Sequence, residues 1–175
     1  HQFSLGANDG KPAYIASGAV DGQVLNQFSM SEYNGDLRIA TTDWDWSGQG
    51  GGNHLFVLRA NGRSLETIGS IRGLAKGERI YSGRMFGDKG YIVTFRQTDP
   101  LFTLDLSNPR APAILDTCDN GFGHVTDLAI LGTRAYLAND GVINVVDISD
   151  PANLVCVAFT SLPSIAPKAT IVCSN

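Results

Sequence analysis

Two stretches of the sequence decide the fold: "FRQTDPLFTLDLSNPRAP" at residues 95–112 and "NDGVINVVDISDPANLV" at residues 139–155. Each reads as an apolar strand, then the turn Asp-(Leu/Ile)-Ser-(Asn/Asp)-Pro, then a second strand. Asn and Asp close such turns through hydrogen bonds to the nearby backbone, and Pro presets the φ angle of the turn. The same supersecondary unit therefore occurs twice in the chain.

The repeat extends in both directions from this turn. With Phe102 as the anchor of the third strand of a unit, Phe56 lies 46 residues earlier and Asn144 lies 42 residues later. The stretches "EYNGDLRIATT", "MFGDKGYIVTF" and "ILGTRAYLAND" each read as strand, tight turn, strand. Four short strands repeating about every 40–50 residues are typical of β-propeller blades. A β-sandwich, the alternative fold, would not repeat the same turn at near-constant spacing.

The expected fold is therefore all-β, a single β-propeller-type domain over residues 1–175 whose blades have four antiparallel strands. The segment "KATIVCSN" at residues 168–175 is a candidate closing strand. Either this strand closes a small ring, or the chain is an arc that another polypeptide completes. The start at His1 without a Met favours the second alternative, because the chain then looks cut from a longer design. The expected units are a partial blade over 1–20 and full blades over about 25–71, 79–118 and 124–160.

Composition limits the partners of the chain. The net charge of −4 provides no basic surface of the kind that neutralises phosphates, so we expect no nucleic acid partner. No apolar stretch approaches the roughly 20 residues of a membrane-spanning helix. The three cysteines lack the CxxC spacing of zinc sites. We expect a disulfide between Cys156, on the outer strand of the last blade, and Cys173, on the terminal strand, with Cys118 left as a thiol.

Two longer stretches resemble a known family. Residues 14–42, "YIASGAVDGQVLNQFSMSEYNGDLRIATT", and residues 77–109, "GERIYSGRMFGDKGYIVTFRQTDPLFTLDLSNP", resemble secreted bacterial and archaeal β-propeller domain proteins distantly related to WD40 repeats. Residues 124–151, "HVTDLAILGTRAYLANDGVINVVDISDP", are similar to the LVIVD repeats of surface propellers. Known members are much longer than this chain. The resemblance implies an exported, surface-associated protein, secreted or held at the cell surface, and implies no catalytic residues.

The strongest candidate binding segment is "TTDWDWSGQGGGNH" at residues 41–54, which is longer than the equivalent connections of the next two blades. Such loops often carry binding residues. Trp44 and Trp46 share one face of an extended segment and could stack on a sugar ring or anchor a protein partner. Asp43 and Asp45 alternate with them and could hold Ca²⁺, the one cofactor considered. In the alternative interpretation, the tryptophans pack over the blade edge.

A second group of candidates lies at the start of a blade. Arg79, Arg84, Arg96 and Asp99 could line a central channel and meet an anionic ligand. The alternative is that these side chains form ion pairs that fix one blade against the next. In the same stretch, Tyr81 and Phe95 are expected in the core.

Catalytic motifs are not found in the sequence. The three histidines lack the HExxH spacing, and there is no GxSxG, Walker or GxGxxG signature. We therefore expect no catalytic residue and no metal site. The expected function is a non-enzymatic exported module that binds a protein or glycan, self-associates, or builds a cell-surface or extracellular assembly. The alternative is a hydrolase or lyase with its active site at the propeller mouth.

Overall fold

The fold is built almost entirely of antiparallel β-strands. The computed structural model describes residues 1–6, 10–43, 51–95, 100–119, 121–139 and 141–161. Their elements, in chain order, are β1 (Gln2–Ser4), β2 (Ala13–Ala16), the 3₁₀ helix η1 (Gln27–Ser29), β3 (Met30–Tyr33), β4 (Asp36–Thr42), β5 (Asn53–Asn61), β6 (Ser64–Leu74), β7 (Arg79–Phe86), β8 (Lys89–Phe95), β9 (Leu101–Asp105), β10 (Ala113–Cys118), β11 (Asp127–Leu131), β12 (Arg134–Asn139), β13 (Val142–Asp147) and β14 (Val155–Ser161).

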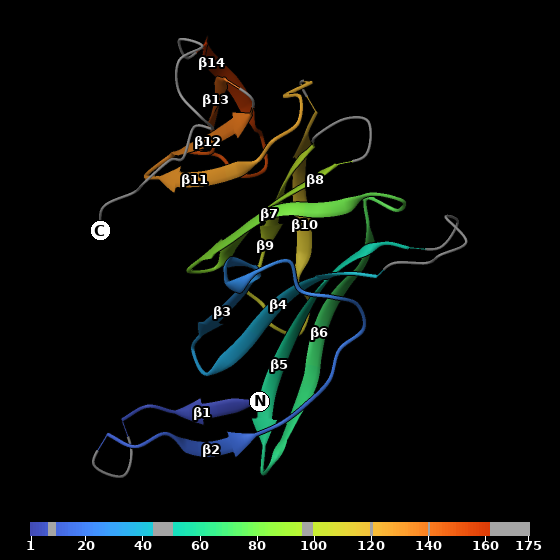
Figure 1. The fold of residues 1–175 in the computed structure, drawn as a ribbon, viewed down its shortest axis with the longest axis vertical. Coiled ribbons are helices and arrows are strands. Elements are labelled where there is room, and N and C mark those ends of the chain that lie inside the picture. The colour runs from blue at the N-terminus through green and yellow to red at the C-terminus, as the bar shows by residue number, and fades with distance from the viewer. Residues whose placement is uncertain (7–9, 44–50, 96–99, 120, 140, 162–175) are drawn as a thin grey trace.

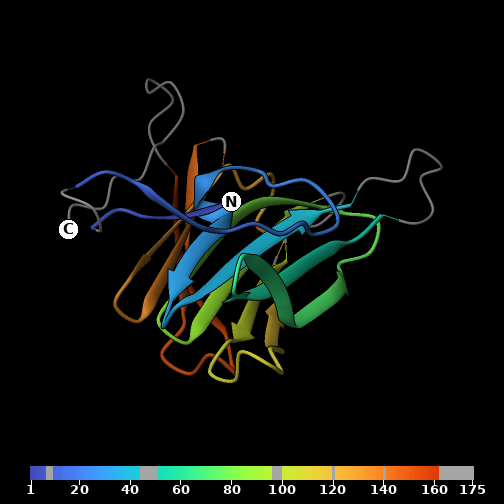
Figure 2. The ribbon, with the colours of Figure 1, turned by 90° about the horizontal axis from the view of Figure 1, so that it is seen from below.

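These strands form four sheets that follow one another in chain order (Figures 1 and 2). The N-terminal sheet pairs β1 with β2. The first sheet has the order β3-β4-β5-β6, the second β7-β8-β9-β10 and the third β11-β12-β13-β14, each antiparallel throughout. The expected all-β fold with four-stranded antiparallel blades is confirmed. The first strand of the second sheet, β7, contacts η1 and β4 as well as β11, so it lies next to both the first and the third sheet.

The first sheet begins at Met30, within the unit expected at about 25–71. The residues just before it form η1, where the Asn26 side chain accepts a hydrogen bond from the Phe28 N–H at 2.9 Å and caps the turn. At the other end, β6 continues to Leu74. The candidate closing strand at 168–175 lies outside the described residues. Within the described residues, no helix is long and apolar enough to cross a membrane.

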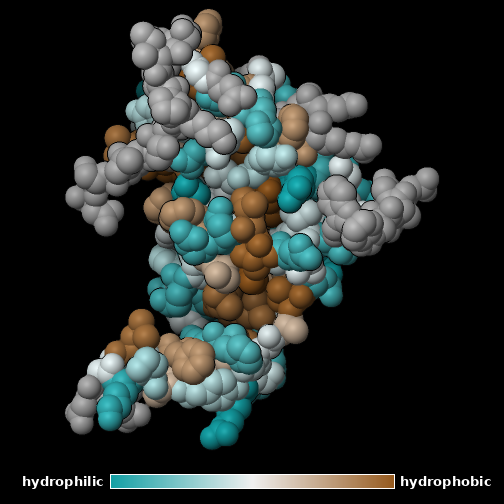
Figure 3. Space-filling model, viewed as in Figure 1, coloured by the Kyte–Doolittle hydropathy of each residue, from teal (hydrophilic) through white to brown (hydrophobic). Residues whose placement is uncertain are grey.

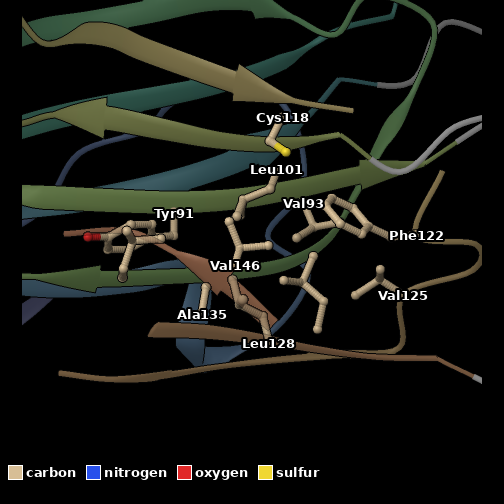
Figure 4. Packing of buried hydrophobic residues seen from close by; sticks show 11 residues of the cluster. Tyr91, Val93, Leu101, Cys118, Phe122, Val125, Leu128, Ala135 and Val146 are labelled. Atoms are coloured by element: carbon tan, nitrogen blue, oxygen red, sulfur yellow. The ribbon is translucent and has the colours of Figure 1, made fainter. Parts of the chain in front are cut away.

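Three apolar clusters hold the sheets together, one at each junction between consecutive sheets. The cluster between the N-terminal and first sheets contains Ala16 and Phe56. The next, between the first and second sheets, contains Leu55 and Ile92. The last, between the second and third sheets, is shown in Figure 4, where side chains such as Val93 interdigitate with side chains of the third sheet.

Neighbouring residues of one strand belong to different clusters. On β8, Ile92 packs toward the first sheet and Val93 toward the third. On β9, Leu101 packs toward the third sheet and Phe102 toward the first. Successive side chains of a strand point to opposite faces, so a strand with a neighbouring sheet on each face must be apolar at consecutive positions. This explains the unbroken apolar runs in the middle of the sequence.

The turn between the third and fourth strands of a sheet forms the joint to the preceding sheet, and in the second and third sheets this is the repeated Asp-x-Ser-x-Pro turn. The Thr103 hydroxyl, on the second sheet, donates a hydrogen bond at 2.5 Å to the carbonyl of Pro151, in the turn of the third sheet. The equivalent carbonyl of Pro109, in the turn of the second sheet, lies against Gly69 of the first sheet. At the N-terminal junction the Ser17 N–H donates to the Arg63 carbonyl at 3.1 Å. We call these three contacts the turn joints.

One cross-strand ion pair recurs in each four-stranded sheet at the same register position. The pairs are Lys89 with Asp105, Arg134 with Asp147, and, with the signs exchanged, Asp36 with Arg59. Asp105 and Asp147 also accept the N–H of the serine two residues later, at 3.0 and 2.9 Å. These serine hydrogen bonds, followed by the neighbouring cation, lower the pKa of both carboxyl groups.

We predict that replacing Gly69 with Val opens the turn joint between the first and second sheets. A Cβ atom at Gly69 would lie 2.2 Å from the Pro109 carbonyl oxygen, so the turn must move. Overpacking of this kind costs about 1–3 kcal/mol, measurable by urea unfolding. Gly83→Ala is the control, because a Cβ atom there would lie 3.9 Å from its nearest neighbour, the Tyr91 carbonyl oxygen. Equal stability of Gly69→Val and the unmutated chain would contradict this role of the joint.

A second prediction concerns acid stability. The pKa values of Asp105 and Asp147 are lower in the folded chain than the ordinary value of 3.8. Their contribution to the free energy of unfolding is therefore present above that ordinary value and is lost as the pH falls below it. The double change Asp105→Asn and Asp147→Asn keeps an oxygen acceptor in each turn and should flatten the loss of stability between about pH 5 and pH 2. Urea unfolding across this range is the measurement, and an unchanged slope would contradict the prediction.

Candidate functional site

The candidate binding segment leaves the first sheet between β4 and β5. Asp43, at its start, is exposed, and its N–H donates to the Gly52 carbonyl at 2.8 Å. Trp44, Asp45 and Trp46 lie outside the described residues, so the roles expected for them stay predictions. The structure instead shows the base from which the segment leaves.

A buried polar network builds this base. The amide of Asn53, which is fully buried, donates to the Leu74 carbonyl at 3.0 Å and its oxygen accepts the Thr42 hydroxyl at 2.8 Å. The Thr42 oxygen in turn accepts the N–H of Ile80 at 3.1 Å. The network therefore ties β4, β5 and β6 of the first sheet to the start of β7. Because buried polar groups are costly to leave unpaired, it holds the two ends of the segment in fixed positions.

A cleft of about 210 Å³ lies beside this base. Residues before η1, including Gln23 and Leu25, line one side of it, and Arg79 and Ile80 of β7 line the other. The guanidinium of Arg79 lies 5.8 Å from the centre of the Tyr81 ring. Arg79, one of the cations expected at a blade start, therefore borders a cleft between the first and second sheets.

His54 faces the same end of the first sheet. Its Nδ1 accepts the N–H of Gly73 at 3.2 Å, which requires this nitrogen to be unprotonated. Burial, and then the nearby charge of Arg72, lower the pKa of His54 below its ordinary value. The imidazole is thus neutral near pH 7 and acts as a structural acceptor.

Arg84, on β7, links the first strand of the third sheet to η1, the 3₁₀ helix that precedes the first sheet. Its guanidinium forms a 3.0 Å ion pair with Asp127 of β11 and lies 4.2 Å from the centre of the Phe28 ring of η1. Of the two roles considered for this residue, channel lining and inter-sheet pairing, the geometry shows inter-sheet pairing. Arg96 and Asp99 lie outside the described residues.

An aromatic group that the sequence did not indicate lies where the second and third sheets meet. The Tyr81 ring is 5.3 Å from Phe95 and 5.0 Å from His124, centre to centre. Tyr81 and Phe95 were expected in the core, but both are only half-buried and His124 is exposed. The three residues come from β7, β8 and the connection before β11, so no local sequence pattern could bring them together.

Apolar surface also gathers around the inner strand of the first sheet. In Figure 3, this apolar surface lies in the middle of the side that faces the viewer, in the region of β4 and β7. The exposed apolar residues of this part of the chain include Val24, Leu25, Phe28 and Met30. Larger exposed apolar areas often mark places of contact with a partner.

The cysteines and acidic residues add no site among the described residues. Cys118 is buried in the cluster between the second and third sheets. Cys156 is exposed on β14 and forms no disulfide with a described residue. Cys173 lies outside the described ranges, so its pairing with Cys156 stays a prediction. No group of three or more His, Cys, Asp or Glu side chains suited to a metal ion occurs in the described part of the chain.

Comparison with known proteins found two matching family models and two similar proteins. A family model described as a beta propeller domain matches residues 1–119, and one described as an LVIVD repeat matches residues 122–159. The chain is similar to the uncharacterized protein MJ1554 of Methanocaldococcus jannaschii, with 40% identity over 147 residues, which cover 78% of this chain and 23% of that protein. It is 49% identical over 120 residues to an uncharacterized protein of Archaeoglobus fulgidus, covering 68% of this chain and 16% of that protein. The chain therefore spans less than a quarter of the length of these relatives.

Proposed function

Because this chain belongs to the beta propeller domain family and carries an LVIVD repeat, we propose that it is a non-enzymatic, exported module that builds a surface assembly through the open faces of its sheets. The observation that carries the proposal is the outer face of the third sheet. Its residues lie at register positions whose equivalents in the second sheet pack against the third sheet.

The equivalence of the two faces follows from strand register. In the second sheet, the residues facing the third sheet include Tyr91, Val93 and Leu101, with Val93 paired opposite Leu101. The same register positions in the third sheet are held by Tyr136, Ala138 and Ile143, with Ala138 paired opposite Ile143. These three side chains point away from the second sheet and lie outside the three apolar clusters of the described chain. Ala138 is fully buried, and Tyr136 and Ile143 are half-buried. They form an apolar face of the kind that packs against another sheet.

The N-terminal sheet presents a second apolar face. Phe3 and Tyr14 pair across β1 and β2 with their rings 5.8 Å apart, and they remain 51% and 46% exposed. Repeat arrays need their terminal faces capped, and unpaired strand edges favour association with another chain. Both outer sides of the described sheets thus carry apolar residues, which supports contact with further sheets of this kind.

Export and ligand binding rest on other observations. The resemblance of residues 14–109 to secreted propeller proteins supports export, and a Cys156–Cys173 disulfide would fit an oxidising compartment. The segment with Trp44 and Trp46, which leaves the fixed base at Asn53, is the proposed contact for a protein or glycan at the cell surface.

The assembly proposal is tested by Ile143→Glu, which places a charge on the outer face of the third sheet. We expect the 175-residue chain to lose self-association in sedimentation experiments, because burying an unpaired carboxylate in the contact is costly. The matched control is Ile114→Glu, on the outer strand of the second sheet, where the side chain is already exposed. A chain that is monomeric throughout, or an Ile143→Glu chain that associates normally, would contradict the proposal.

The ligand proposal is tested by replacing Trp44 and Trp46 with Ala together. Binding to a glycan array should fall by more than about tenfold, because stacked aromatic side chains contribute a large share of such contacts. The temperature of unfolding should change little, since the base of the segment is intact. Phe86→Ala, at another exposed aromatic position, is the control. A large loss of thermal stability with unchanged binding would show that the tryptophans are core residues.

A further inference from the structure

A second cleft of about 210 Å³ lies between the first and second sheets, next to their turn joint. Strands β3, β4 and β5 supply one side of it, including Tyr33, Arg38 and Val57. The other side is the turn of the second sheet, including Leu106 and Pro109. The cleft combines apolar walls with two cations, Arg38 and Arg59, and the carboxylate of Asp36. Nothing in the functions considered above uses it.

Arg38 departs from the repeat at this place. It lies opposite Val57 in the register, just as Tyr91 lies opposite Thr103 and Tyr136 opposite Val145 in the next two sheets. The first sheet thus has an arginine at a position where the other two have a tyrosine. Arg38 is only 3% exposed, although a buried cation is costly to maintain.

The hydrogen bonds of Arg38 leave part of its guanidinium unused. Its Nε donates to the Ser31 hydroxyl at 2.9 Å and one terminal nitrogen, Nη1, donates to the Gly87 carbonyl at 2.5 Å. The group lies 5.0 Å from the centre of the Tyr33 ring. A guanidinium has five N–H donors. No hydrogen bond joins the other terminal nitrogen, Nη2, to a residue in the described part of the chain.

Arg38 also has no direct carboxylate partner among the described residues. The nearby acidic residues are engaged elsewhere: Glu32 accepts the Gly35 N–H at 2.7 Å, and Asp88 pairs with Lys89 at 3.1 Å. Asp36, on the wall of the cleft, is held by both Nε and Nη2 of Arg59 at 2.6 and 2.7 Å. Burial lowers the pKa of Arg38, and the electrostatic effects of Tyr33, then Glu32 and Asp88, only partly oppose this.

We propose that this cleft binds a carboxylate monoanion with an apolar body, held by the Arg38 guanidinium. Since Nε and Nη1 are engaged, the N–H groups of Nη2 remain to donate a charge-assisted hydrogen bond to a carboxylate oxygen. Val57, Leu106 and Pro109 offer apolar contacts to the rest of the ligand. A doubly charged phosphate is disfavoured, because Asp36, Glu32 and Asp88 would repel its second charge. The cleft is small for a ligand site, which suits a small organic acid or the C-terminal carboxylate of a peptide.

The test is a titration of the isotopically labelled 175-residue chain, followed by NMR at the Arg38 Nε–H and the Gly87 amide. The probes are benzoate, the neutral isostere benzamide, inorganic phosphate, and a short apolar peptide with either a free or an amidated C-terminus. We expect saturable shifts at these groups with benzoate, and binding of benzamide weaker by more than about tenfold, the usual loss for a charge-assisted hydrogen bond. Tighter binding of the free-acid peptide than of benzoate would assign the site to peptide ends, and the reverse to small acids.

Substitutions of Arg38 provide an independent test of the proposal. Arg38→Tyr places in the first sheet the residue that the second and third sheets accommodate, so the fold should be retained while benzoate binding falls by more than about tenfold. Arg38→Lys keeps the charge but loses the planar set of N–H donors that holds Ser31 and Gly87 while leaving Nη2 for the ligand, and should bind benzoate more weakly than the unmutated chain. Arg110→Gln, at an exposed position outside the cleft, is the matched control.

Three results would overturn the proposal. They are equal binding of benzoate and benzamide, tighter binding of phosphate than of benzoate, and unchanged benzoate binding in a folded Arg38→Tyr chain. If Arg38→Tyr does not fold, the ligand comparison on the unmutated chain decides alone. The association tests of the third sheet use other residues, so either proposal can fail without the other.

Discussion

The structure depends on one constraint: an inner sheet of the array buries both of its faces. The second sheet contributes Ile92 to one apolar cluster and Val93, the next residue, to another. A strand in this position cannot alternate apolar and polar residues as a half-exposed strand does. The stability of the sheet is therefore shared between two junctions.

The turn joints add direction to this non-directional packing. Apolar contacts alone would let two sheets slide, whereas the carbonyls of Pro109 and Pro151 each meet one place on the preceding sheet. Gly69 gives the first joint room for the carbonyl, and Thr103 gives the second a hydrogen-bond donor. Two different residues thus solve the same geometric requirement. The cross-strand ion pairs behave similarly, since Asp36 and Arg59 exchange the signs found in the other two sheets without changing the register.

The candidate functional positions lie where the repeat is broken. The segment between β4 and β5 is longer than its equivalents and leaves from a buried network around Asn53. Arg38 replaces a tyrosine and brings a cation to the wall of a cleft. Because the scaffold is supplied by the repeated positions, these departures can differ without loss of the fold.

The sequence alone determined the blade architecture, because the strand periodicity and the Asp-x-Ser-x-Pro turns are local patterns fixed by backbone geometry. It also indicated Arg84 as a residue with either of two roles. Only the tertiary structure decided between them, since Asp127 lies 43 residues away in the chain and meets Arg84 only when two sheets pack. For the same reason, the sequence alone did not predict two other features. Tyr81, Phe95 and His124 form one group, and Arg38 lines a cleft, only through contacts between sheets. Such contacts depend on how whole faces dock, which no short stretch of sequence specifies.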